Sequence, residues 1–340
     1  MPADQSSSEP ASSPQNSAGR RPARTTAYLL GRLVAIGFVL LVVALLAAEL
    51  AARIAFGFSM DEPIVILDAH CEYRLAPGVY QGGYTVNDDG MRSPPIPETK
   101  PDGEFRVLVL GDSVTEGSTD LTNDQLATNT AERALNDGPR DGTTFRVLNA
   151  SVGSWSVVNQ IGFIDAFGDF DADAIVLVFN TADATDGFGT PLAPTSQPIC
   201  GLHRAVRLAR IRFNPVGERA VFYEPDGIFA KANAAALNRL IDHAESRGIP
   251  LVAIWHPKKD ELANGEDAAR AQSMLDVFAS RGVEIVRFSE SLKRSASDSS
   301  SAGENPYADN IHLAAPGHRL LADLLVEQIR GMVPTPGESP

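Results

Sequence analysis

The chain has 340 residues, enough for one large domain or two small ones, and 44% of them are hydrophobic, as expected of a protein with a packed core. It holds 29 Lys and Arg against 43 Asp and Glu, which gives a formal net charge of -14. This excess of negative charge repels phosphate backbones, so we do not expect nucleic acid as a partner.

The N-terminal segment divides into a polar tail and an apolar helix. Residues 1–28 are rich in Ser, Pro, Ala and Gln, and we expect a disordered cytoplasmic tail. Residues 29–54 contain an uncharged run which, with its apolar flanks, reaches the roughly 20 residues that a membrane-spanning helix needs. Four arginines precede or begin this run: Arg20, Arg21, Arg24 and Arg32. By the positive-inside rule we expect a single-pass signal anchor in the cell membrane, with the body on the extracytoplasmic side, periplasmic or outer.

Two other interpretations of this helix remain open. A cleaved signal peptide needs small residues at its cleavage site, and the best match puts Leu50 and Ala52 there. A buried core helix fits poorly with the basic flank. On the exported side, Cys71 and Cys200 are either a disulfide or two free buried thiols, and their surroundings do not have the spacing of a zinc site.

The body begins with a lead-in and continues as a series of short apolar runs. Residues 55–104 contain turn signals such as NDDG and SPPIP, and we expect an irregular segment there. The runs follow within 105–331, at 105–110, 145–150, 174–179, 250–255 and 283–288. Each is brief, β-branched and nearly continuous rather than alternating, which is typical of parallel strands buried on both faces. We expect residues 332–340 to be a disordered tail.

Helical stretches separate these strands, at 122–138, 231–248, 266–282 and about 316–330. The first three end on a glycine, the usual C-terminal stop of a helix. Strands that alternate with helices predict an α/β fold, here a three-layer α/β/α sandwich with a mostly parallel, five-stranded, flavodoxin-like sheet.

Three residues near the predicted strand ends have the chemistry of a serine hydrolase. Ser113 follows the first strand in VLVLGDSVTEG, and Asp309 and His312 stand three residues apart just before the last helix. A serine nucleophile needs a base within hydrogen-bond reach, and that base needs a carboxylate to fix its tautomer. Because ligands bind beyond the carboxyl ends of parallel strands, we expect these three side chains to meet at one edge of the sheet.

The motifs VLVLGDSVTEG and DNIHLAAPGH resemble those of the SGNH, or GDSL, hydrolases, over roughly residues 87–330. The lead-in YTVNDDGMRSPPIPETKPDGEFRVLVLGDS also resembles that of membrane-anchored members. The resemblance implies an SGNH-type fold in which Ser113 is the nucleophile and Asp309 and His312 complete the triad.

The resemblance also implies an oxyanion hole with three donors: the Ser113 N–H, a glycine N–H and an asparagine side chain. In NASVGSWS the glycine is Gly153, one residue before its frequent position in the family, where Ser154 stands. In VFNTADATD, Ala182 stands where the asparagine is expected, and Asn180 is the candidate third donor, or a turn residue at the strand end. This departure leaves the catalytic strength of the site open.

The function implied is a carboxylic ester hydrolase that hydrolyses or transfers acyl groups, with O-acetyl or other short-chain esters on envelope glycans or lipids as substrates. The alternative is a catalytically weakened module of the same fold that binds a glycan. We expect no metal or organic cofactor, since no cluster has ligand spacing and no glycine-rich phosphate loop is present. The arginines at 204, 207, 210 and 212 indicate either a site for anionic lipid or acidic glycan, or a solvated helix face.

Overall fold

The computed structural model describes residues 23–56, 65–137, 142–185, 227–265, 268–297 and 304–333. The chain divides into two compact units, with the boundary after Phe58. Cys200 and the arginines at 204–212 lie outside the described residues, as do the first 22 residues and the last seven.

In the first unit the structure describes one helix, α1, Ala23–Phe56. Its segment Tyr28–Ala48 has a mean hydropathy of 2.7 and is long and apolar enough to cross a membrane, by length and composition. A signal sequence near the N-terminus would have the same properties, so both interpretations of this helix stand.

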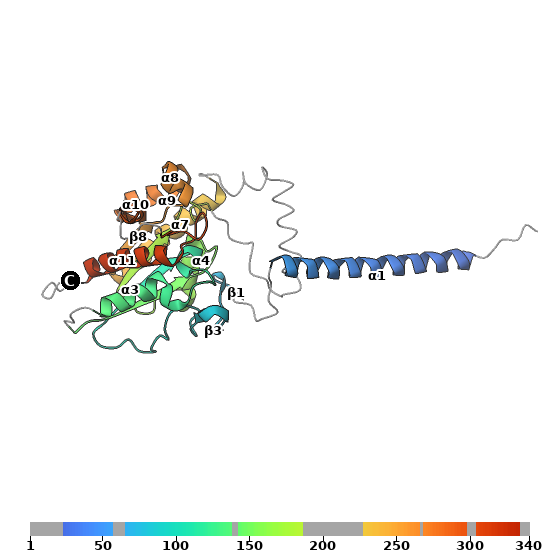
Figure 1. Ribbon diagram of the computed structural model, residues 1–340, viewed down its shortest axis with the longest axis horizontal. Coiled ribbons are helices and arrows are strands. Elements are labelled where there is room, and N and C mark those ends of the chain that lie inside the picture. The colour runs from blue at the N-terminus through green and yellow to red at the C-terminus, as the bar shows by residue number, and fades with distance from the viewer. Residues whose placement is uncertain are drawn as a thin grey trace, which may run out of the picture. The chain divides into compact units, whose positions relative to one another are not determined.

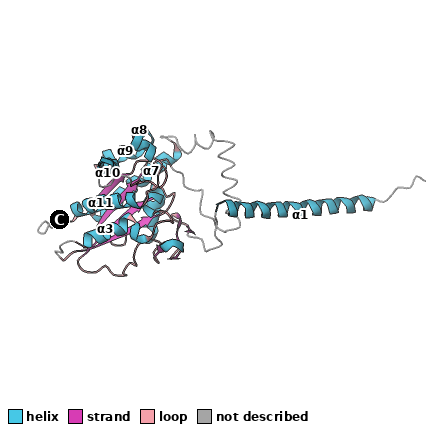
Figure 2. Ribbon diagram, in the orientation of Figure 1, coloured by secondary structure: helices cyan, strands magenta, loops and turns pink. Residues whose placement is uncertain are grey.

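The second unit is built around a five-stranded sheet (Figure 2). Its strands are β5 (Glu104–Gly111), β6 (Thr144–Ser151), β7 (Ala174–Phe179), β8 (Leu251–Trp255) and β9 (Ile285–Arg287). They lie in the order β6-β5-β7-β8-β9, and every pair is parallel. The five predicted strands are confirmed, and the order is that of a flavodoxin-like sheet.

Helices cover both faces of this sheet (Figure 1). Along β5, Val107 and Val109 point into one core, and Leu108 and Leu110 into the other. The first core is closed by α3 (Ala127–Asn136), α10 (Phe288–Ser297) and α11 (Ala315–Met332). The second is closed by α4 (Val157–Phe167), α7 (Ile228–Arg247) and α9 (Ala268–Arg281). The predicted three-layer α/β/α sandwich is therefore confirmed.

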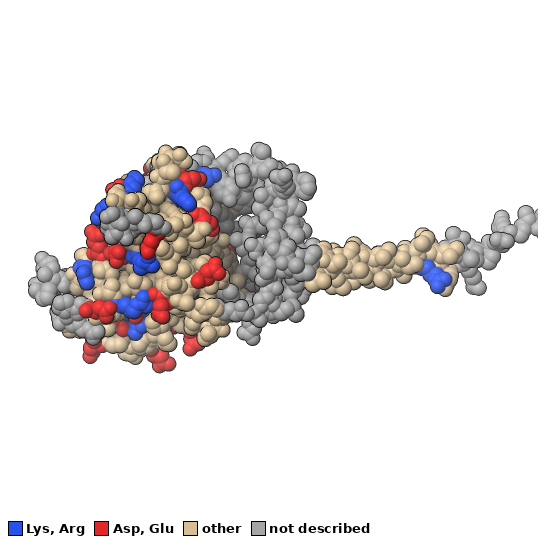
Figure 3. Space-filling view, in the orientation of Figure 1, with Lys and Arg blue, Asp and Glu red and all other residues tan. Residues whose placement is uncertain are grey.

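Several elements were not expected. Helix α4 connects β6 to β7, helix α10 follows β9, and the single turn α2 (Ser113–Glu116) and the short α8 (Lys259–Asn264) follow β5 and β8. The predicted helix at 122–138 is divided into the 3-10 turn η2 (Asn123–Gln125) and α3. Figure 3 shows acidic and basic side chains mixed over the face of this unit that is in view, so the negative net charge does not gather into one patch there.

The lead-in segment, which we expected to be irregular, contains two small antiparallel sheets. These pair β1 (Val65–Asp68) with β2 (Glu72–Leu75), and β3 (Gly78–Val79) with β4 (Thr85–Val86), with the 3-10 turn η1 (Gln81–Gly83) between the last two strands. Strands of two to four residues are too short to show an alternating pattern. The segment packs on the second core, where Trp155 donates its Nε1–H to the Tyr73 carbonyl oxygen (2.9 Å).

Candidate active site

The nucleophile candidate stands at the end of β5, which lies between β6 and β7 in the sheet. Strand β5 ends at Gly111, and Asp112 caps the turn α2 by accepting the Val114 N–H (2.9 Å). Ser113 is the first residue of that turn. Because the chain leaves β5 towards β6 on one side and β7 lies on the other, Ser113 lies at the topological switch point, where α/β sheets bind their ligands.

The structure brings the three predicted triad residues together. The Ser113 Oγ lies 2.9 Å from His312 Nε2, and His312 Nδ1 lies 2.6 Å from Asp309 Oδ2. In this order the imidazole can accept the serine proton while the carboxylate holds the opposite ring nitrogen protonated. The arrangement is that of a serine, its general base and an orienting acid.

Hydrogen bonds to the Asp309 carboxylate favour its ionised form. Its Oδ1 accepts the backbone N–H groups of Ile311 (2.8 Å) and His312 (2.7 Å), and its Oδ2 faces the imidazole. Partial burial favours the neutral acid, but these hydrogen bonds outweigh it and lower the pKa of Asp309 to about 2. The negative charge therefore remains available to stabilise an imidazolium on His312 throughout the neutral range.

The loop that bears Asp309 and His312 is attached to the segment after β8. Tyr307 donates its hydroxyl to the Pro257 carbonyl (2.7 Å), and the Lys259 N–H donates to the Asn310 carbonyl (2.8 Å). The Asn310 side chain also donates to Asp260 Oδ1 (3.1 Å). These bonds fix the triad loop against the edge of the sheet.

Two of the three predicted oxyanion donors lie at the nucleophile. The Ser113 N–H has no acceptor among the residues described. Gly153 is also close, since a β-carbon added to it would lie 3.6 Å from Ser113 Cβ. Its N–H, however, donates to Glu116 Oε2 (2.5 Å).

Ser154, the residue after Gly153, has a backbone conformation that is typical of glycine. Ser154 has a φ of 63°, a left-handed conformation that favours glycine, and it is exposed. The loop thus keeps the turn geometry of a glycine at position 154 while a serine occupies it, and the N–H beside the nucleophile is that of Gly153.

The third predicted donor, Asn180, is engaged elsewhere. Its buried Nδ2 donates to Asp112 Oδ2 (3.0 Å) and to Asp183 Oδ2 (3.1 Å), which uses both amide hydrogens. In this arrangement the amide holds two carboxylates in place and has no hydrogen left for a substrate oxygen. Ala182, where the resemblance expects an asparagine, has no side-chain donor.

Four further residues at the site were not identified from the sequence. The Tyr84 hydroxyl donates to Glu116 Oε1, and the Tyr73 hydroxyl donates to the Gly153 carbonyl (2.8 Å). Arg92 is fully buried, stacks 3.8 Å over the Tyr84 ring and donates to the Gly117 carbonyl (2.8 Å). Glu116 stands in the GDSVTEG motif, whereas nothing in the sequence of the lead-in marked its tyrosines and arginine.

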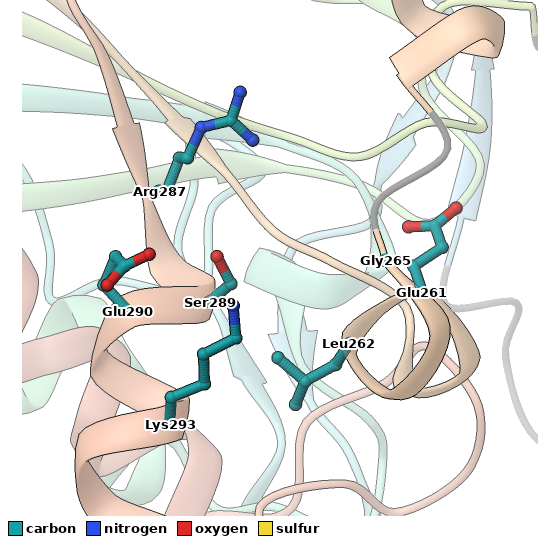
Figure 4. Close-up of a pocket in the computed structure, with 7 residues that line it drawn as sticks. All are labelled: Glu261, Leu262, Gly265, Arg287, Ser289, Glu290 and Lys293. Atoms are coloured by element: carbon teal, nitrogen blue, oxygen red, sulfur yellow. The ribbon is translucent and has the colours of Figure 1, made fainter.

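A separate pocket lies between α8 and α10, next to β9 (Figure 4). It is lined by Glu261, Leu262, Gly265, Arg287, Ser289, Glu290 and Lys293. None of the triad residues lines it. Glu261 connects this pocket to the end of β7, because Thr181 donates its hydroxyl to Glu261 Oε1.

No protein-family model and no curated protein sequence matches this chain. Among solved structures, TesA is 15% identical with a TM-score of 0.44, over 67% of this chain and 99% of its own. The acetyl xylan esterase AlAXEase is 12% identical with a TM-score of 0.43, over 66% of this chain and 99% of its own. A member of the lipolytic G-D-S-L family from Veillonella parvula is 15% identical with a TM-score of 0.38, over 66% of this chain and 97% of its own. At such distances a function has to be argued from the residues of the site itself.

Proposed function

We propose that the protein is a serine ester hydrolase of the SGNH type, which hydrolyses or transfers small acyl groups. The observation that carries the proposal is the continuous hydrogen-bonded chain from Ser113 through His312 to Asp309, at 2.9 Å and 2.6 Å. A serine on an ordinary turn needs neither a base nor an acid behind that base.

The geometry supports a two-step acyl transfer. Ser113 Oγ attacks the ester carbonyl carbon, and its proton moves to His312 Nε2. The carbonyl oxygen becomes an oxyanion, and Asp309 stabilises the imidazolium. When the intermediate collapses, the bond to the leaving alcohol breaks and His312 returns the proton to that alcohol. A water molecule, or a hydroxyl of a second substrate, then takes the acyl group from Ser113 by the reverse proton path.

The substrates proposed are O-acetyl and other short-chain esters on glycans or lipids of the cell envelope. The sequence motifs and the expected export of the second unit support this choice. Hydrolysis and transfer to a sugar hydroxyl use the same three residues, so the acceptor has to be found by assay.

The test is hydrolysis of p-nitrophenyl acetate by the full chain in detergent micelles, with Ser113→Ala beside it. We expect the wild type to release acetate and to be labelled by a fluorophosphonate, and Ser113→Ala to do neither. Ser246→Ala, an exposed serine on α7, is the matched control and should retain full activity.

A second candidate function is glycan binding by a weakened site. It is favoured by Ala182, by the engaged amide of Asn180 and by the Gly153 N–H bound to Glu116. A folded wild type that binds an acetylated oligosaccharide in calorimetry, but neither hydrolyses it nor reacts with the fluorophosphonate, would favour this alternative.

We further propose that α1 anchors the protein in the cell membrane with its N-terminus in the cytoplasm. The hydropathy of Tyr28–Ala48 and the preceding arginines support this orientation. Protease added outside intact spheroplasts should digest the second unit of the protein, and washing at high salt should leave the protein in the membrane fraction. Release of the second unit in soluble form would instead indicate a cleaved signal peptide.

A further inference from the structure

Glu116 lies at the end of the helical turn that begins with the nucleophile. The two residues are three positions apart on α2, so their side chains share one face of the turn. The Glu116 Oε2 accepts the Gly153 N–H at 2.5 Å, and a β-carbon added to Gly153 would lie 3.2 Å from that oxygen and 3.6 Å from Ser113 Cβ. The carboxyl group therefore stands beside the place that the oxygen of an attacked ester will occupy.

This position matters because the site is short of oxyanion donors. The side-chain amide of Asn180 donates its hydrogen bonds to Asp112 and Asp183, and Ala182 has no side-chain donor. Two backbone N–H groups remain, those of Ser113 and Gly153, and the second is bound to Glu116. Any substrate oxygen that reaches Gly153 must therefore meet the Glu116 carboxyl group as well.

The charge of Glu116 decides whether contact between its carboxyl group and the substrate oxygen favours or opposes the reaction. An ionised carboxylate beside a developing oxyanion would oppose it, whereas a neutral carboxylic acid would donate a hydrogen bond to it. Enzymes are known in which a buried, neutral carboxylic acid serves as an oxyanion donor.

The surroundings of Glu116 favour the neutral form. Burial raises its pKa above the ordinary value, and the nearby charge of Asp112 acts in the same direction. The Tyr84 hydroxyl, the Gly153 N–H and the charge of Arg92 act in the opposite direction without cancelling the effect. These are the charged and titrating groups that face Glu116 from the lead-in and from the end of β5.

We propose that Glu116 is a donor of the oxyanion hole and takes the place of the missing asparagine. The inference rests on the esterase function proposed above. As Ser113 attacks, the substrate oxygen receives hydrogen bonds from the Ser113 N–H and from the carboxylic O–H of Glu116, while the Gly153 N–H stays bound to Glu116 Oε2. The proton of Glu116 stays on its own oxygen, so the proton balance of the triad is unchanged, and Tyr84 keeps the carboxyl group oriented.

The test is the pH dependence of kcat/KM for p-nitrophenyl acetate, measured on the full chain in detergent between about pH 5 and pH 10. The wild type should lose activity at alkaline pH as Glu116 ionises. Glu116→Gln keeps a donor that does not titrate, so it should stay active within about tenfold and lose the alkaline limb. Glu116→Ala should fall by about 10²–10³-fold, as when an oxyanion donor is removed.

Two more variants separate this role from a structural one. Tyr84→Phe removes a hydrogen bond that favours the ionised form, so the alkaline limb should move to higher pH. Glu132→Gln is the matched control. Glu132 also accepts a backbone N–H, that of Val147 (2.8 Å), and burial also raises its pKa, but it lies on α3, outside the catalytic machinery. Its pH profile should equal that of the wild type.

Three results would overturn the proposal. Glu116→Gln could be as inactive as Glu116→Ala, its alkaline limb could persist unchanged, or Glu116→Ala could exceed the wild type at every pH. The last result would mean that the carboxylate merely blocks the hole. In each case a Ser113-dependent wild-type activity would leave the esterase function standing. A wild type that is neither active nor labelled at Ser113 would overturn both.

Discussion

His256 donates its Nε2–H to the backbone carbonyl of Ile311 at 2.8 Å, and so connects the end of β8 to the residue just before His312, the proposed catalytic base. The imidazole is buried between the rings of Phe288 and Tyr307, with centroid distances of 5.8 Å and 5.7 Å. His256 therefore positions the triad loop, and its hydrogen bond goes to that loop and not to Ser113.

Replacing His256 should loosen that loop. His256→Leu leaves the Ile311 carbonyl without its donor, which should lower the free energy of unfolding by about 1–3 kcal/mol. We also expect kcat to fall by about tenfold, which corresponds to about 1.4 kcal/mol, with KM little changed. His256→Gln retains an N–H donor and should recover most of kcat. Equal loss in both variants would contradict a role for this hydrogen bond.

Replacing Asp309 should trap His312 in the wrong tautomer. In Asp309→Asn the amide oxygen can still accept the N–H groups of Ile311 and His312, which leaves the amide NH2 facing His312 Nδ1. The ring proton then moves to Nε2, the atom that must accept the serine proton. We expect kcat to fall by about 10⁴-fold in steady-state assays, with little change in KM. Asp323→Asn, an exposed carboxylate on α11, is the control, and a loss below about tenfold for Asp309→Asn would contradict the assigned role.

The stability of the second unit should fall below neutral pH because two histidines are buried as neutral rings. Burial lowers the pKa of His256 to about 4, and burial together with the charge of Arg92 lowers the pKa of His318 to about 3. The unfolded chain binds protons at both rings near the ordinary value of 6.5, while the folded chain does not. Between about pH 7 and pH 5 each ring should therefore remove about 2 kcal/mol of stability.

Urea unfolding checks this expectation, since both tryptophans, Trp155 and Trp255, lie in the second unit. His318 Nδ1 accepts the Ala127 N–H (3.3 Å), and the oxygen of an asparagine can take over that bond. Between about pH 7 and pH 5, the free energy of unfolding of His318→Asn should fall by about 2 kcal/mol less than that of the wild type. Identical losses would show that His318 is not the titrating group.

Ser154→Gly should stabilise the protein. A left-handed residue other than glycine costs about 1–2 kcal/mol, and the extra freedom of glycine in the unfolded chain returns about 0.5–1 kcal/mol of that. The net gain in the free energy of unfolding should be about 0.5–1 kcal/mol, with activity retained. Ser280→Gly, an exposed serine in the last turn of α9, is the control and should not stabilise the protein. A Ser154→Gly protein that is less stable than the wild type would show that the loop gains nothing from glycine there.

The sheet and the triad could be predicted because their signals are local. Each sheet strand contains a short, nearly continuous apolar run, and all six residues of β7 are buried, as that pattern requires. Ser113 and the pair Asp309 and His312 each stand in a short motif directly after or before a predicted element. Helix α4 also has a local signal in the sequence, since Gly168 follows its last residue, as expected at the C-terminal end of a helix. This glycine has a φ of 82°.

The rest of the site depends on contacts that no local pattern encodes. Tyr84 and Glu116 are 32 residues apart, and Glu116 and Gly153 are 37 apart. Whether Asn180 faces a substrate or two carboxylates is a matter of side-chain rotamer, which the spacing of a motif does not determine. The third oxyanion donor was for this reason the least secure part of the sequence prediction.

Arg92 has a consequence for how much of the chain the proposed catalytic site needs. Its buried guanidinium donates to the carbonyl oxygens of Glu116, Gly117, Ser118 and Leu121, and so closes the chain around the segment that follows the nucleophile. These hydrogen bonds hold the lead-in against the catalytic turn, and an N-terminal truncation that removes Arg92 would remove them. A shortened protein that starts at β5 would retain every triad residue and every strand of the main sheet. It would lose the hydrogen bonds of Arg92 to the segment that follows Ser113. We therefore expect the part of the chain that is needed for a closed catalytic turn to begin before Arg92, upstream of the first strand of the main sheet.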